Sequence, residues 1–145
     1  KNVKTTNETL LYFRETNELT GMTEDFIIKN NLYIAYQGEK INDYYATSFE
    51  EAFILQNYNN KILNSALVDT KPTIYGQIVE KNDYEQNKLN SYKWQVKLSE
   101  DKGKFANNLF FEITTADKNE DIPELPEYIS NGLKWLEREL GKNNV

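Results

Sequence analysis

The sequence contains no cysteine and no histidine among its 145 residues. The absence of cysteine excludes disulfide bonds and thiolate metal ligands within the chain. The absence of histidine excludes Ser-His-Asp and Cys-His nucleophilic catalysis and any His-ligated zinc site. Carboxylates, lysines, tyrosines and backbone groups are left for chemistry. This set favours Mg²⁺, Mn²⁺ and Ca²⁺, the common metals that prefer oxygen ligands.

The sequence also lacks long apolar runs. No stretch approaches the ~20 consecutive apolar residues that cross a bilayer, and no basic segment followed by an apolar run indicates a secretory signal. We therefore predict a cytoplasmic protein with no membrane partner. The chain begins with Lys1 rather than Met, which suggests that it is truncated or processed.

Blocks of like charge are missing as well, and the formal net charge is −6. A protein that held DNA by phosphate contacts alone would carry a clustered basic face, and the sequence shows no such cluster. Two alternatives follow. Either nucleic acid is not a partner, or it is contacted through bound cations and through parts of the protein outside this chain.

The length and composition predict one globular domain. A chain of 145 residues can bury one core but not two sizeable ones, and its 10 Tyr, 7 Phe and 2 Trp are not typical of a disordered tail. Strand patterns are few: residues 32–36 are β-branched and aromatic, and residues 74–79 look extended. Helical patterns predominate, so the sequence predicts an α/β or α+β fold weighted to helix.

Three helices are predicted in the last part of the chain. Residues 89–98 form the first. The second has an apolar face at helical spacing, made of Phe105, Ala106, Leu109, Phe110 and Ile113. The third opens at residues 123–126 and ends at Gly141. We expect its apolar face to pack against the rest of the protein; that face consists of Leu125, Ile129, Leu133, Leu136 and Leu140.

Another predicted helix, which begins near residue 48, carries two adjacent acids in its first turn. Ser48 followed three residues later by Glu51 has the pattern of a capping box, and Thr47 with Glu50 fits the same pattern one residue earlier. Both acids also complement the helix dipole, which is an ordinary structural role. If Ser48 is the cap, Glu51 is used in capping and Glu50 is free to project. A free carboxylate at this position is a candidate ligand for a hard metal ion.

Two lysines, Lys102 and Lys104, precede the helix that contains Phe105. The dipole of a helix disfavours cations at its N-terminus, so one of these lysines is a candidate for a functional role, although solvated surface lysines are common. The sequence does not decide between the two.

Five segments, in order along the chain, resemble motifs of one nuclease family. They are residues 5–10, 34–37, 45–54, 102–106 and 126–136. The third is similar to the string ARSFEEAFI, the fourth to KxxFA and the fifth to PxYIxxGLxWL. These are motifs of OLD-family (overcoming lysogenization defect) ATP-dependent endonucleases, and the five segments are spread along the chain from residue 5 to residue 136.

The resemblance implies a specific fold and chemistry. OLD proteins join an ABC-type ATPase to a C-terminal TOPRIM domain, which cuts DNA with two divalent metal ions held by a glutamate, a D-x-D pair, a later acidic residue and a lysine. Residues 1–145 would then be the C-terminal portion of a TOPRIM nuclease domain, a helix-rich α/β fragment with few strands. By motif position, Glu50 would be the later acidic residue, a catalytic metal ligand, and Lys102 or Lys104 the catalytic lysine, with Lys102 favoured.

The chain also departs from the family pattern. Thr47 stands where the family usually has arginine, and the sequence contains no D-x-D and no Walker A motif. On this interpretation the ATPase with its ATP, the first glutamate and the D-x-D lie before Lys1. They would complete the Mg²⁺ or Mn²⁺ site, and the isolated fragment is expected to be inactive. We expect DNA to be a partner through the full-length protein, with homo-oligomerisation as an additional prediction.

Two other functions are compatible with parts of the sequence. A non-catalytic protein-interaction domain would suit the tyrosine and asparagine content and the amphipathic last helix. A stand-alone hydrolase that uses Glu50 and Glu51 as a carboxylate pair is disfavoured, because adjacent helical residues project about 100° apart and would not converge on one substrate.

Overall fold

The computed structural model describes residues 8, 11–12, 15, 28–29 and 32–142. The chain divides into two compact units, and each is considered by itself. The helical unit is Lys40–Pro126, and the terminal unit combines Lys1–Glu39 with Glu127–Val145. The segment 5–10, which carried one of the five motif resemblances, lies outside the described residues except for position 8. None of the described helices is long and apolar enough to cross a membrane.

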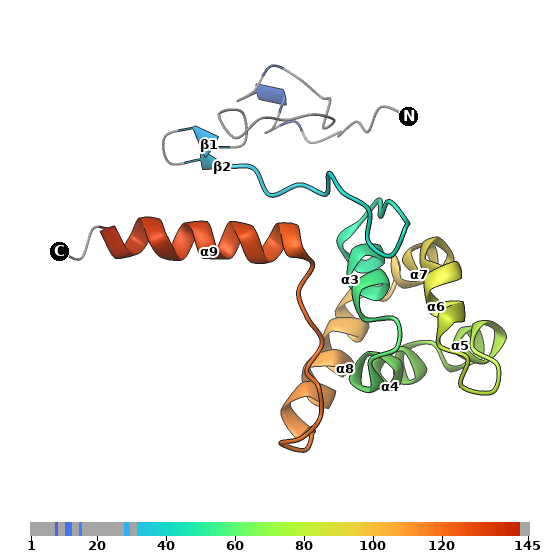
Figure 1. Cartoon of the computed structure of the whole chain (residues 1–145). Helices are drawn as coiled ribbons and strands as arrows, with labels where there is room; N and C mark the ends of the chain where they lie inside the picture. The colour runs from blue at the N-terminus through green and yellow to red at the C-terminus, as the bar shows by residue number, and fades with distance from the viewer. Residues whose placement is uncertain (1–7, 9–10, 13–14, 16–27, 30–31, 143–145) are drawn as a thin grey trace. The chain divides into compact units, whose positions relative to one another are not determined.

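Six helices make up the described helical unit (Figure 1): α3 Phe49–Asn57, α4 Lys61–Thr70, α5 Pro72–Ile78, α6 Glu85–Leu89, α7 Ser91–Leu98 and α8 Lys102–Thr115. Helix α8 packs against α4, and α7 packs against α3. The core between them contains fully buried apolar side chains, among them Ile54, Leu63, Leu67, Trp94 and Leu98. Because side chains of α3, α7 and α8 belong to this one core, the three helices are held together by it.

A tight turn leads the chain into α3. Ile41 and Tyr44 pair as an isolated antiparallel bridge, and the two residues between them, Asn42 and Asp43, have positive φ angles of 47° and 70°. Asparagine and aspartate tolerate this left-handed conformation better than most residues. The Asn42 amide also donates to the Leu55 carbonyl oxygen at 2.6 Å, so the turn is tied to the last part of α3.

The extended conformation predicted for residues 74–79 is wrong, because α5 covers Pro72–Ile78. Pro72 occupies the first turn, where its missing N–H would have no partner in any case. Ile78 is buried in the core, and Ile74, one helical turn earlier, packs against that core. A spacing of four residues satisfies both the helical period and the alternation of a strand, so the apolar pattern alone did not distinguish the two.

The terminal unit combines a short β-ribbon with a helix. Strand β1 (Ile28–Lys29) pairs antiparallel with β2 (Leu32–Tyr33), with Ile28 opposite Tyr33. The run 32–36 is therefore a strand only over its first two residues. Helix α9 (Glu127–Lys142) packs on this segment, with the ring of Trp135 5.4 Å from that of Tyr33. A Cβ atom at Gly132 would lie 3.3 Å from that of Ala35, so glycine permits the close approach.

The predicted apolar face of the last helix is not the face that packs within the terminal unit. Leu133 and Leu136 are 52% and 47% exposed, whereas Trp135 is 8% exposed. The packed face, which includes Gly132 and Trp135, is offset by one residue from the predicted one. The sequence pattern favoured leucines, but one tryptophan buries more apolar area than each of them. The helix also continues to Lys142, one residue past the predicted end.

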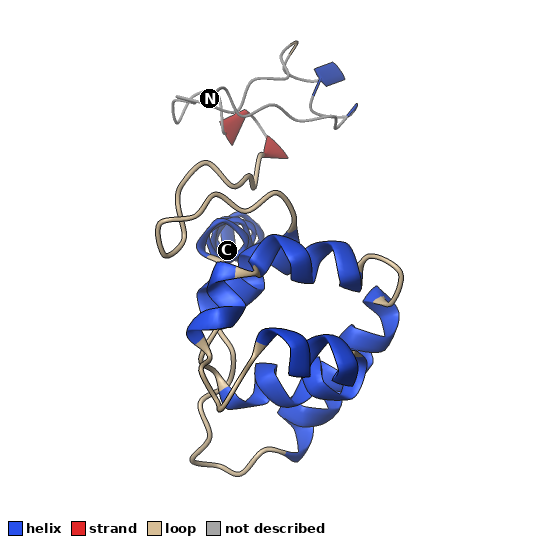
Figure 2. Cartoon of the chain, turned by 90° about the vertical axis from the view of Figure 1, so that its right-hand side faces the viewer, coloured by secondary structure: helices blue, strands red, loops and turns tan. Residues whose placement is uncertain are grey.

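The other helical predictions from the last part of the chain agree with the structure in their location. The predicted helix at 89–98 corresponds to α7 and the end of α6, and α8 contains the predicted apolar face. In α8, Phe105 is buried and Leu109 packs against the core, but Phe110 is exposed. The described chain is mostly helical (Figure 2). Its assignment to a TOPRIM-type α/β domain over residues 1–145 stays a prediction.

Candidate functional site

Helix α3 begins with the first of the two predicted capping boxes. Ser48 is the cap, in extended conformation with φ −148° and ψ 167°, and its Oγ accepts a hydrogen bond from the Glu51 N–H at 3.2 Å. The alternative pair, Thr47 with Glu50, is not used for capping. Because a cap hydroxyl satisfies one of the free N–H groups of the first turn, Ser48 fixes where α3 starts and therefore in which directions Glu50 and Glu51 project.

Glu51 is buried and engaged by hydrogen bonds. Its Oε2 accepts from the Thr47 N–H at 2.7 Å and from the Thr47 hydroxyl at 2.8 Å. Its Oε1 accepts from the Ser91 hydroxyl of α7 at 3.2 Å. The side chain of a standard capping box returns to the N–H of the cap itself, whereas here it reaches one residue further back. Only the Ser48 half of the predicted capping box is therefore formed, and the Glu51 carboxylate instead joins α3 to Thr47 and to Ser91 of α7.

Glu50 points to a different helix. The Nζ of Lys102, the first residue of α8, lies 2.8 Å from Glu50 Oε1. The Glu50 side chain is 13% exposed and the Lys102 side chain 56% exposed. The structure therefore brings together two residues that the sequence motifs singled out separately, and it places them at the N-terminal ends of two helices.

The environment of Glu50 favours its charged form. Burial alone raises the pKa of this carboxyl, but hydrogen bonds from Lys102, from its own backbone and from Ser48, together with the charge of Lys102, lower it more. The net result is a pKa below the usual value. Glu50 is therefore a carboxylate at neutral pH and can attract a cation.

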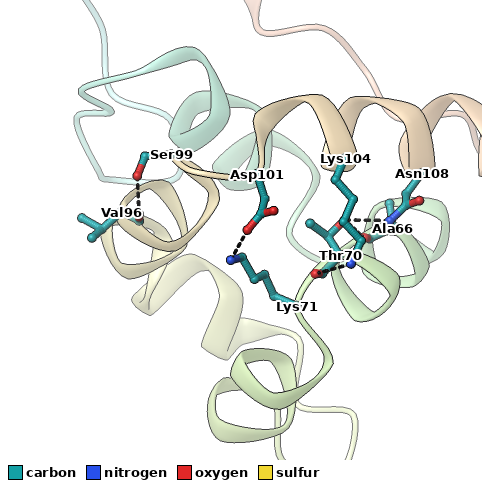
Figure 3. Close-up of polar contacts among 8 residues, drawn as sticks. All are labelled: Ala66, Thr70, Lys71, Val96, Ser99, Asp101, Lys104 and Asn108. Atoms are coloured by element: carbon teal, nitrogen blue, oxygen red, sulfur yellow. Dashed lines mark hydrogen bonds and ion pairs between the residues drawn. The ribbon is translucent and has the colours of Figure 1, made fainter.

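Lys104 has a different partner, as Figure 3 shows. Its Nζ donates to the Thr70 carbonyl oxygen at 3.1 Å, at the C-terminus of α4. The Thr70 hydroxyl in turn donates to Ala66 and accepts from Asn108. A cation at a helix C-terminus is favoured by the dipole and satisfies a carbonyl that lacks a helical partner. Lys104 thus serves the end of α4, whereas Lys102 pairs with Glu50 of α3.

An ion pair strengthens the same junction between α4 and α8. Lys71, which follows α4, pairs with Asp101, which precedes α8 (Figure 3). The two lysines Lys71 and Lys104 therefore fix α8 on α4. The first turn of α8, which carries Lys102, is held against the unit by contacts that do not involve Lys102 itself.

The donor chemistry around Glu50 suits a hard metal ion, but the number of donors does not suffice for a site. A carboxylate with a half-buried environment is an ordinary Mg²⁺ or Mn²⁺ ligand. Among the described residues, however, no group of three or more acidic side chains could hold a metal ion. Among the described residues, Glu50 therefore offers a single carboxylate to a metal ion rather than a complete site.

A buried polar network in the helical unit was not predicted from the sequence. The Trp94 indole N–H donates to Asn87 Oδ1 at 2.9 Å, and the Asn87 amide donates to Asn64 Oδ1 at 2.8 Å. The Tyr75 hydroxyl donates to the same Asn64 oxygen at 2.7 Å. Burial, with a smaller contribution from Tyr84, raises the pKa of Tyr75 to about 12. This network joins four helices, α4 to α7, and its hydrogen bonds explain why polar side chains occupy the core.

A polar pocket of about 690 Å³ lies near the other end of α3, away from Glu50. It is lined by the end of α3, the start of α4 and the loop before α9, including Gln56, Asn60 and Asp121. The Asn60 amide donates to the Asp121 carbonyl oxygen at 2.6 Å, which holds the loop in place. Neither Glu50 nor Lys102 lines this pocket.

Comparison with known proteins finds one informative relative. The chain is 51% identical over 138 residues to Endonuclease GajA of Bacillus cereus (strain HuB5-5). The aligned region is 94% of this chain and 20% of that protein, so the chain spans about a fifth of the length of the curated relative that it matches. No protein-family model matches the chain, and no solved structure matches it.

Proposed function

We propose that this chain is part of a DNA endonuclease of the OLD type and forms the C-terminal portion of its TOPRIM domain. The observation that carries the proposal is the 2.8 Å contact between Glu50 and Lys102. The family motifs assign Glu50 to the site and favour Lys102 over Lys104 as its lysine. The 51% identity to a protein named as an endonuclease supports the same conclusion independently of the contact.

In the proposed mechanism Glu50 would be one of the ligands of a divalent cation, Mg²⁺ or Mn²⁺. When bound, such an ion activates water and clamps the scissile phosphate. The role of Glu50 is to present an ionised carboxylate from the first turn of α3, and Lys102 contributes to lowering the pKa of that carboxyl. The α3 dipole also favours the charged form of Glu50.

Lys102 has a separate role in this mechanism. Its ammonium group is more than half exposed and sits on a flexible stem, so it can contact a phosphate group of DNA while remaining near Glu50. There it stabilises the negative charge that develops on the phosphate oxygens as the bond to the leaving oxygen breaks. The helix dipole disfavours the positive charge of Lys102 at the N-terminus of α8, and the Glu50 carboxylate offsets this effect when DNA is absent.

The remaining parts of the proposed enzyme lie outside this chain. They are the ATPase with its ATP, the other acidic metal ligands, and surfaces that hold DNA. The isolated chain is therefore inactive in this proposal. The acidic net charge of −6 agrees with DNA contact through cations and other parts of the protein. The proposed location is the cytoplasm.

The experiment measures nicking of supercoiled plasmid by the full-length protein with Mg²⁺ or Mn²⁺. We expect Glu50→Ala and Lys102→Met each to lower the cleavage rate roughly a hundredfold or more. Lys104→Met is the matched control, because it removes a lysine two residues away that caps α4 instead. Cleavage at the parent rate by both Glu50→Ala and Lys102→Met would refute the assignment.

A second function has one observation in its favour. Leu133 and Leu136 of α9 and Phe110 of α8 are about half exposed or more, as expected if the chain is a non-catalytic interaction domain. That function predicts a dimer or a complex with another protein and no metal dependence. Light scattering and pull-down with the chain test it, and a monodisperse monomer with no partner would contradict it.

A further inference from the structure

The first turn of α3 is fixed from two directions by adjacent glutamates. Glu51 is fastened to α7 through Ser91 and to the preceding loop through Thr47. Glu50 faces α8 through Lys102. Adjacent residues of a helix project about 100° apart, so the two carboxylates serve different neighbours although they share one turn of backbone.

Glu51 is not built to be a metal ligand itself. It is 4% exposed, and its two oxygens accept hydrogen bonds from three donors, two on Thr47 and one on Ser91. A metal ion at Glu51 would have to replace several of these hydrogen bonds in a buried position. The ordinary consequence of such a buried, saturated carboxylate is rigidity of the backbone that carries it.

We propose that Glu51 is the positioning residue for Glu50, and that it acts by fixing the first turn of α3 so that the Glu50 carboxylate points toward the metal. This inference rests on the proposed function. The first turn of a helix has N–H groups without helical partners and frays easily. With Glu51 removed, the first turn of α3 loses its hydrogen bonds to Thr47 and to Ser91 of α7, and Glu50 samples more orientations, including ones in which it cannot bind a cation. Residues that orient a metal ligand in this way contribute strongly to metal affinity.

The experiment measures Mn²⁺ binding to the full-length protein by electron paramagnetic resonance without DNA, so that binding is separated from catalysis. We expect Glu51→Ala to weaken the part of Mn²⁺ binding that depends on Glu50 by roughly tenfold to a hundredfold. Ser91→Ala removes one of the three donors and should have a smaller effect. Glu51→Gln should bind close to the parent, because its amide oxygen can accept from Thr47 and its NH₂ can donate to the Ser91 hydroxyl.

Asn87→Ala is the control for a merely structural effect. It breaks the buried network around Trp94, lowers stability, and touches neither Glu50 nor Glu51. If Asn87→Ala weakens Mn²⁺ binding as much as Glu51→Ala at equal loss of thermal stability, the positioning role is overturned. It is equally overturned if Glu51→Gln binds as poorly as Glu51→Ala, because the charge of Glu51 rather than its hydrogen bonds would then matter.

The Glu50→Ala variant separates this inference from the proposed function. If Glu50→Ala binds Mn²⁺ as well as the parent, the proposed metal role of Glu50 is wrong, and the positioning role is overturned with it. If Glu50→Ala loses binding while Glu51→Ala keeps it, the proposed function stands and only the positioning role of Glu51 is overturned.

Discussion

Lys102 Nζ lies 2.8 Å from Glu50 Oε1 and joins the first turn of α8 to the first turn of α3. A cation at a helix N-terminus is ordinarily unfavourable, and an anion there is favourable. The ion pair with Glu50 offsets the unfavourable position of the Lys102 charge, while Glu50 keeps its favourable position at the start of α3. The same contact leaves the Lys102 side chain 56% exposed, so the ammonium group stays open to solvent.

The contact with Lys102 should make stability depend on pH through Glu50. A carboxyl whose pKa is lowered in the folded state stabilises the protein above its usual pKa of 4.5, and this contribution is lost as the pH falls through the lowered pKa. We therefore expect the parent to lose more thermal stability than Glu50→Gln between neutral pH and a pH below 4.5. The measurement is the melting temperature with a chelator present.

The matched variant for this prediction is Lys102→Met, which removes the other partner of the same pair. It should flatten the pH dependence in the same window, because the hydrogen bond and the charge that lower the Glu50 pKa come mostly from Lys102. Parent and Glu50→Gln curves that fall in parallel would show that the pair does not form in solution.

The two neighbouring lysines should differ in their contribution to stability. Lys104 donates to a carbonyl oxygen at the end of α4, so we expect Lys104→Met to lower the free energy of unfolding by about 1 kcal/mol. Lys102 pairs with Glu50 through a side chain that is 56% exposed. Ion pairs open to solvent are typically worth ~0–1 kcal/mol, so Lys102→Met should cost less. Urea unfolding of both variants measures the difference. A larger loss for Lys102→Met would contradict the distinction made between these two lysines.

The sequence predicted the start of α3 because the information there is local. A cap residue and the acid three positions later determine the pattern, and Ser48 with Glu51 satisfied it. Pairing of Glu50 with Lys102 could not be derived in this way, because it depends on how α8 packs against α4. The family motifs named both residues, but only the packing places them in contact.

Where the prediction failed, the structure depends on residues that are distant in the sequence. For α9, the leucine spacing is a strong local pattern, yet Trp135 and Gly132 lie on the packed face, where a Cβ atom at position 132 would be 3.3 Å from that of Ala35. For the core, Asn87 appeared as one polar residue in a polar stretch. Its burial depends on two residues of other helices: the Trp94 indole N–H donates to Asn87, and the Asn87 amide donates to Asn64.

Asn87 should therefore contribute more to stability than its sequence context indicates. Replacement by alanine leaves the Trp94 indole N–H buried without its partner, which typically costs about 1–3 kcal/mol. The exposed Asn107 on α8 is the matched control, and surface substitutions of that kind usually change stability by less than about 0.5 kcal/mol. Urea unfolding followed by tryptophan fluorescence measures both variants. Equal midpoints would mean that the network around Asn87 is absent.

The packing of α9 on β2 can be tested with two glycines of the same helix. An added Cβ at Gly141 meets nothing within 4 Å, whereas at Gly132 it lies 3.3 Å from the Ala35 Cβ. Alanine is favoured over glycine in a helix by up to about 1 kcal/mol, so Gly141→Ala should increase the hydrogen-exchange protection of the α9 amides. Gly132→Ala should gain less, and Gly132→Val should lose protection, because β2 must move away. If Gly132→Val protects α9 as well as the parent does, then α9 does not pack on Tyr33 and Ala35, and the face that carries Leu133 and Leu136 becomes the better candidate for its packed side.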